Sequence, residues 1–206
     1  MAAFPKVPAS PPGLLTAQPD DIRSFTGALW RINVVKGRHP SVWNGFRTFG
    51  PTGSRWDPHP SPPGDHAGFG VLYTATEPAT CAAEVFQLQR TIVLSDHHAL
   101  TGWQPTRPLR LLDLTGGWAL RQGASNSLSA ADRVVCRRWA AAIRLAWPAL
   151  DGLYVLSTMT GVETVVLFEP AGDSFPAAPN FQRPLDHPLV HALMDRASAR
   201  CGYRLA

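Results

Sequence analysis

Short apolar segments with the pattern of β-strands make up most of this chain, and helical segments separate them only at irregular intervals. In residues 28–35 (ALWRINVV), apolar side chains alternate with Arg31 and Asn33, which is typical of a half-buried strand that presents Arg31 away from the core. Comparable segments follow at residues 71–73, 90–96, 109–115, 153–157 and 162–170. The regular strand–helix alternation of a doubly wound parallel sheet is absent. We therefore expect an α+β fold, a single domain with mixed or antiparallel sheets.

Three helices are predicted between and after these strands. Residues 76–86 (TEPATCAAEVF) read as a short helix that begins near a proline. Residues 125–150 give the clearest helical pattern, and Ser129 with Asp132 resembles a capping box at its start. A last helix is expected within residues 186–202.

The length of 206 residues fits one domain with a short arm. Residues 1–20 are rich in proline and form the expected arm, and residues 21–206 form the expected domain. Residues 38–70 are rich in Gly, Pro and Trp and cannot be continuous regular structure. Long irregular segments inside a compact domain are uncommon and are often functional. Without a bilayer-length apolar run or a signal-peptide pattern, we expect a soluble, cytoplasmic protein.

Composition excludes some classes of protein. The three cysteines, Cys81, Cys136 and Cys201, lie far apart and form no Cys-x-x-Cys pair, so a disulfide framework or a zinc ribbon is not expected. The formal net charge is +4, and nearly all basic residues are arginines. Arginine suits an anionic ligand because its guanidinium grips phosphate with two hydrogen bonds. The charge is not concentrated in a basic run, so nucleic-acid binding is not indicated.

Several common catalytic motifs are absent from the sequence. There is no P-loop, no Gly-x-Ser-x-Gly serine motif and no His-Glu-x-x-His zinc motif. Gly68-Phe69-Gly70 precedes a strand instead of following one, so it does not match a dinucleotide fingerprint. His97 and His98 are neighbours that would point to opposite faces of a strand. We therefore expect no metal site.

A few polar residues stand out against the apolar strands and helices. They are Arg31, Arg55, Tyr73, Glu84 and Ser157. Glu84 lies among small and apolar residues of its helix, without a basic residue four positions before or after it. Helix statistics alone favour a solvated Glu84, and the alternative is a carboxylate held in a pocket for chemistry.

The motifs around these residues occur in an order that resembles the RES-domain family, which is named for its arginine, glutamate and serine. The resemblance covers residues 29–170, and the second motif has Ser54 and Asp57 where the family often has Gly and Asn. In chain order the motifs are Trp30-Arg31, Ser54-Arg55-Trp56-Asp57-Pro58, Leu72-Tyr73-Thr74-Ala75, Ala83-Glu84-Val85, Asp151–Ser157 and Val165–Phe168.

The resemblance implies a toxin of a bacterial type II toxin–antitoxin system. The family fold is similar to that of ADP-ribosyltransferase toxins, in which NAD⁺ lies in a cleft between sheets. Its members consume NAD⁺ by hydrolysis or phosphorolysis of the nicotinamide–ribose bond. Their partner is an Xre-like antitoxin with a helix-turn-helix part, and they tend to form homodimers within larger toxin–antitoxin complexes. The resemblance therefore implies that NAD⁺ is a substrate, with no cofactor, no membrane contact and no direct nucleic-acid binding.

The five polar residues suit this chemistry. Cleavage of the nicotinamide–ribose bond builds positive charge on the ribose, which the Glu84 carboxylate would stabilise. Arg31 and Arg55 can grip the pyrophosphate, Tyr73 can stack on nicotinamide, and Ser157 can hydrogen-bond the ribose or the carboxamide. We assign Glu84, Arg31 and Ser157 to catalysis. We assign Arg31, Arg55, Tyr73 and Ser157 to substrate binding.

Two alternatives stay open at this point. The first keeps the fold and the NAD⁺ site but transfers ADP-ribose to a protein side chain. The second is a basic, non-enzymatic protein that binds nucleic acid, with an affinity that falls steeply as salt is added.

Overall fold

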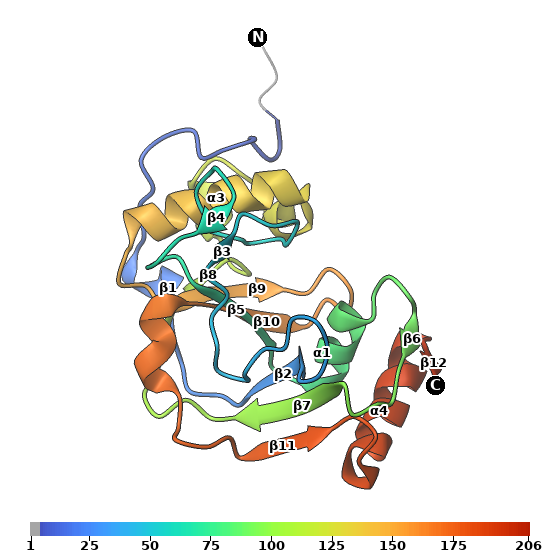
Figure 1. Ribbon diagram of the computed structural model, residues 1–206. Helices are drawn as coiled ribbons and strands as arrows, with labels where there is room; N and C mark the ends of the chain where they lie inside the picture. Colours follow the sequence, from blue (N-terminus) through green and yellow to red (C-terminus); the bar gives the residue numbers. More distant parts are fainter. Residues whose placement is uncertain (1–4) are drawn as a thin grey trace.

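The computed structural model describes residues 5–206, and its centre is one eight-stranded sheet (Figure 1). The strand order is β1-β8-β9-β10-β5-β2-β7-β11, and every neighbouring pair is antiparallel except β8–β9. The predicted α+β fold with a mixed sheet is confirmed. The strands are β1 (Ile22–Phe25), β2 (Leu29–Val34), β5 (Val71–Ala75), β7 (His98–Trp103), β8 (Leu109–Asp113), β9 (Gly152–Leu156), β10 (Glu163–Phe168) and β11 (Phe181–Pro184).

The central strands are apolar at nearly every position because both faces of the sheet are covered. On β10, Val166 packs into a buried group that includes side chains of α2 (Trp118–Arg121) and α3 (Arg133–Ala146). Its neighbour Val165 points to the opposite face and packs into a second group with Leu72 of β5. The sheet therefore separates two cores, and a continuous apolar segment at β10 is what such a position requires.

A third buried group holds α1 (Pro78–Val85) and α4 (Pro188–Cys201) against β2, β5 and β7. Cys81, Ala82 and Ala83 are buried, and their small size lets α1 lie close to the sheet. The Tyr203 hydroxyl donates to the Ala83 carbonyl at 3.1 Å, and Arg200 pairs with Glu77 at 2.7 Å. These contacts fix the helix that carries Glu84.

The helix expected at residues 125–150 is divided into two parts. A 3₁₀ helix spans Asn126–Ala130, and α3 begins only at Arg133. Asp132 caps α3, because its side chain accepts a hydrogen bond from the Val134 backbone N–H at 2.7 Å. Ser129 is buried inside the 3₁₀ helix, so the expected capping box between Ser129 and Asp132 is wrong.

Residues 1–4 of the expected arm lie outside the described residues, and residues 5–18 contain no helix or strand. This part lies against α2 and α3. The Trp139 indole donates to the Pro8 carbonyl at 3.0 Å, and the Trp118 indole donates to the Thr16 carbonyl at 2.9 Å. Leu15 also packs against the buried group that contains these two tryptophans. The described part of the arm is therefore attached to the body.

The segment 38–70 is irregular, as expected, apart from the short strands β3 (Phe49–Gly50) and β4 (Gly64–Asp65), which pair with each other. An isolated bridge between Arg47 and Val71 attaches it to the first residue of β5. It crosses the sheet near α1 and α3 (Figure 1).

The strand expected at residues 90–96 is shorter than predicted. It ends at Ile92 as β6 (Thr91–Ile92), which pairs with β12 (Arg204–Leu205) outside the main sheet. The strand that enters the main sheet here is β7, which the sequence pattern did not indicate.

Candidate functional site

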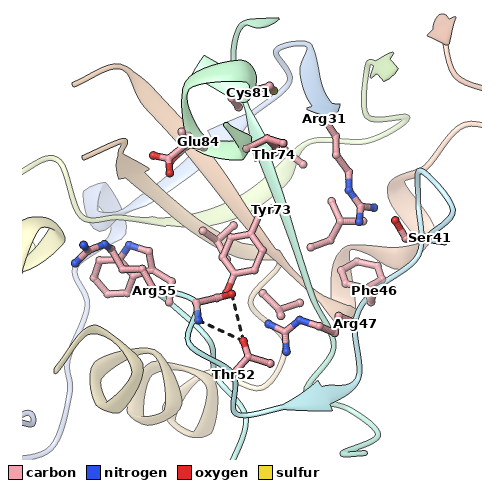
Figure 2. Close-up of a pocket in the computed structure, with 18 of the residues that line it drawn as sticks. Arg31, Ser41, Phe46, Arg47, Thr52, Arg55, Tyr73, Thr74, Cys81 and Glu84 are labelled. Carbon is pink, nitrogen blue, oxygen red and sulfur yellow. Dashed lines mark hydrogen bonds between the residues drawn. The ribbon is translucent and has the colours of Figure 1, made fainter. Parts of the chain in front are cut away.

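A cavity of about 1040 Å³ opens where the sheet, α1 and the segment 38–70 meet. Its volume lies just above the usual range for small-molecule sites, about 300–1000 Å³, and is large enough for a dinucleotide. The five residues selected from sequence all line it: Arg31, Arg55, Tyr73, Glu84 and Ser157. Figure 2 labels all of these except Ser157.

Glu84 and Ser157 form a direct pair. The Ser157 hydroxyl donates to Glu84 Oε1 at 2.6 Å and accepts hydrogen bonds from the backbone N–H groups of Met159 and Thr160. The turn after β9 therefore fixes the direction of the hydroxyl proton. Within residues 5–206, no basic side chain forms an ion pair with Glu84. The carboxylate lines the cavity, and no cation of the described chain lies within ion-pair distance of it.

Arg31 is enclosed, although the strand pattern placed it on a face away from the core. Its Nη1 donates to the carbonyls of Val42 and Trp43 at 3.0 and 2.9 Å, and no carboxylate in the described chain pairs with it. Burial lowers the pKa of the guanidinium to about 10, so it remains charged at neutral pH. The segment 38–70 thus covers this face of β2 and leaves a partly desolvated cation that is available to an anionic ligand.

Tyr73 and Arg55 form another part of the wall. The Tyr73 hydroxyl is buried and has no hydrogen-bond partner among the described residues, and burial raises its pKa well above the usual range. The hydroxyl therefore stays neutral at physiological pH. Arg55 Nη1 donates to the Ala131 carbonyl and contacts Cys136 Sγ at 3.5 Å, which ties the guanidinium to the start of α3.

Sequence reasoning missed a further arginine in the cavity, Arg47. Arg47 Nη2 pairs with the fully buried Asp57 carboxylate at 3.0 Å. Asp57 also accepts bonds from the backbone and hydroxyl of Thr52 and from the backbone and ring of His59. The acid in the second motif therefore holds Arg47 and the segment around it, and it forms no ion pair with Arg55. The only available sequence signal was the unusual composition of residues 38–70.

Other kinds of site are not found in the described residues 5–206. No group of three or more His, Cys, Asp or Glu side chains there could hold a metal ion. No helix in that range is long and apolar enough to cross a bilayer. Cys81, Cys136 and Cys201 are free thiols.

The fold and the cavity define a class of protein, an α+β domain whose large cleft combines several guanidinium groups with carboxylates, Glu84 among them, that form no ion pair in the described chain. The sequence model of the RES domain matches residues 28–187, and the chain belongs to the RES-domain family. A chain of the crystal structure of the M. tuberculosis MbcT–MbcA toxin–antitoxin complex has a similar fold, with a TM-score of 0.57 and 20% identity. The similarity covers 84% of this chain and 92% of that one. No curated protein matches the sequence.

Proposed function

We propose that this protein is the toxin of a toxin–antitoxin pair and that it degrades NAD⁺ by cleaving the nicotinamide–ribose bond. The observation that carries the proposal is the Ser157–Glu84 hydrogen bond of 2.6 Å at the wall of a large cavity that also contains Arg31, which pairs with no carboxylate of the described chain. The Glu84 carboxylate is anionic where a ribosyl cation would form, and the Arg31 guanidinium is cationic where a phosphate would bind. Family membership supports the same reaction.

In the proposed reaction, the bond between ribose C1′ and the nicotinamide nitrogen breaks, and its electron pair leaves with neutral nicotinamide. Positive charge then develops on C1′ and the ring oxygen, and the Glu84 carboxylate stabilises it. Ser157 keeps that carboxylate in place. Water or phosphate next donates an electron pair to C1′, and a proton is released when water is the acceptor. Arg31, Arg55 and Tyr73 would hold the remainder of the substrate.

The proposed partner is an Xre-like antitoxin with a helix-turn-helix part, in a complex that contains a toxin homodimer. The similarity in fold to a chain of a toxin–antitoxin complex supports such a partner. An antitoxin that covers the mouth of the cavity would block entry of NAD⁺. This assignment also places the protein in the bacterial cytoplasm, where NAD⁺ is available.

Expression of the protein alone in a bacterial host tests the proposal. We expect cellular NAD⁺ to fall before growth stops. Glu84→Gln removes the charge but keeps the size of the side chain, and we expect it to slow NAD⁺ loss by about a hundredfold or more. Growth arrest with normal NAD⁺, or full toxicity of Glu84→Gln, would contradict the proposal.

The acceptor requires a separate measurement. Incubation with NAD⁺ labelled in its adenine distinguishes the two enzymatic alternatives. Label that appears only in free ADP-ribose or its phosphate supports degradation, and label on protein supports ADP-ribosyl transfer.

A further inference from the structure

The cavity contains a second polar region, formed by Arg47, Phe49 and Asp65, that chemistry at the nicotinamide ribose does not require. Phe49 of β3 and Asp65 of β4 are directly paired in an antiparallel ribbon. Side chains at such paired positions lie next to each other on one face of the ribbon. Both residues line the cavity, so an aromatic ring and a carboxylate lie side by side on the wall contributed by the segment 38–70.

Arg47 is held rigidly beside this ribbon. Its backbone pairs with Val71 through hydrogen bonds of 2.9 and 3.0 Å, Nη1 donates to the Phe49 carbonyl, and Nη2 pairs with Asp57. The Asp57 carboxylate accepts hydrogen bonds from Arg47, Thr52 and His59, so it is not paired with Arg47 alone. The Arg47 side chain remains 32% exposed. Figure 2 shows Arg31, Arg47, Arg55 and Glu84 arranged around Tyr73. The guanidinium is therefore fixed in place and still open to the cavity.

Phe49 and Asp65 are also open to a ligand. Phe49 is 51% exposed as a residue, although an aromatic residue of this size is usually covered. Asp65 Oδ1 accepts a hydrogen bond from Thr48 Oγ1 at 3.0 Å, and Oδ2 has no partner among the described residues. An aromatic face, a carboxylate oxygen and a guanidinium are the groups that bind a purine base, a ribose diol and a diphosphate.

We propose that Arg47, Phe49 and Asp65 form a subsite for an adenosine diphosphate group. Arg47 binds the diphosphate, Phe49 stacks on adenine, and Asp65 accepts hydrogen bonds from the hydroxyls of the adenosine ribose. The subsite rests on the proposed function because it takes this group as the distal half of NAD⁺. It also sets substrate choice, since the Asp65 carboxylate repels the 2′-phosphate of NADP⁺.

Calorimetric titration of the full-length protein with ADP tests the subsite without requiring catalysis. We expect wild type to bind ADP, with an affinity that decreases as salt is added. Phe49→Leu keeps an apolar side chain but removes the aromatic face, and we expect it to weaken ADP binding about tenfold. Phe49→Tyr keeps the aromatic face and should restore binding. Arg110→Gln, at an exposed position on β8, is the charge-matched control for Arg47→Gln, and only Arg47→Gln should weaken binding.

Turnover gives a second readout. Asp65→Asn should lower the ratio of kcat/KM for NAD⁺ to that for NADP⁺ by about tenfold, since one like-charge repulsion is removed. Phe49→Leu should lower kcat/KM for NAD⁺ more than for nicotinamide riboside, which lacks adenine and phosphate.

The outcomes separate the two proposals. Wild type that does not bind ADP, or Phe49→Leu and Arg47→Gln variants that fold and bind ADP like wild type, would overturn the subsite while leaving NAD⁺ cleavage standing. Wild type that leaves NAD⁺ intact, yet binds ADP through Arg47 and Phe49, would support the subsite and contradict the proposed function.

Discussion

Glu84 and Ser157 are 73 positions apart in the sequence, and one hydrogen bond joins their side chains at the cavity wall. The neighbours of Glu84 in its helix are small and apolar, so local sequence alone favoured a solvated carboxylate. The structure gives the carboxylate a hydroxyl donor that is itself fixed by two backbone N–H groups. At the scale of single residues, the site therefore depends on a pair whose members come from a helix and a distant turn.

Ser157→Ala removes this donor and should reduce NAD⁺ cleavage about tenfold to a hundredfold, because a hydrogen bond to a charged group contributes about 1.5–3 kcal/mol. The reduction should appear mainly in kcat, measured by release of nicotinamide. Ser24→Ala, at an exposed position on β1, should retain wild-type rates. A Ser157→Ala variant with unchanged kcat would show that the Glu84 carboxylate does not need this hydroxyl.

Asp57 makes the free energy of unfolding depend on pH in the acid range. Burial alone would raise its pKa, but hydrogen bonds from Thr52 and His59 outweigh burial and lower it to about 2. The folded pKa lies below the unfolded value of about 3.9, so the stabilisation is complete above that value and is lost as pH falls towards 2. We expect this group to contribute about 2–3 kcal/mol to the free energy of unfolding at neutral pH.

Denaturant titrations at a series of pH values between about 5 and about 2 measure this contribution. Wild type should lose stability across that range, and Asp57→Asn should be less stable at neutral pH and show a shallower pH dependence. The exposed Asp195→Asn variant is the control and should follow wild type. Equal slopes for wild type and Asp57→Asn would contradict the assignment.

At the scale of elements, the segment 38–70 acts as a wall of the cavity without forming long helices or strands. Its order comes from polar contacts centred on Asp57 and from close packing of His59 against Gly50. A Cβ atom at Gly50 would overlap the His59 ring, whereas one at Gly53 would meet no atom within 4 Å. The two glycines therefore offer a matched test of how the wall is held.

Gly50→Ala should lower the free energy of unfolding by about 1–3 kcal/mol, because the added methyl group forces the His59 ring to move. It should also weaken ligand binding, since Arg47 and Phe49 belong to the same segment. Gly53→Ala should change both quantities little. Thermal unfolding of the two variants measures the first effect, and equal melting temperatures would argue against tight packing of this wall.

At the scale of the whole molecule, the sequence predicted those strands in which apolar side chains follow a regular pattern. The apolar strands β2, β5, β8, β9 and β10 were recognisable because burial on one or both faces imposes a pattern. The strand β7 was not, because His98, Thr101 and Gly102 interrupt its apolar pattern. Gly102 is needed there, since a Cβ atom would overlap the Trp30 ring. The edge strands β1 and β11 are short and partly polar, so they resemble loops in sequence.

The candidate site was predictable only where residues fell into family motifs. Those motifs led to five residues that do line one cavity. Arg47, Phe49 and Asp65 could not be selected in the same way, because an irregular segment has no periodicity that reveals which side chains face inwards. Their placement depends on pairing between β3 and β4 and on the contacts of Asp57, which are set by tertiary structure.

Chromatographic analysis of NAD⁺ incubated with the purified protein, with and without phosphate, tests the central claim most directly. The account predicts free nicotinamide together with ADP-ribose, or together with phosphorylated ADP-ribose when phosphate is the acceptor, and a large loss of both products with Glu84→Gln. Unchanged NAD⁺, or products in which the nicotinamide–ribose bond is intact, such as nicotinamide mononucleotide with AMP, would contradict it.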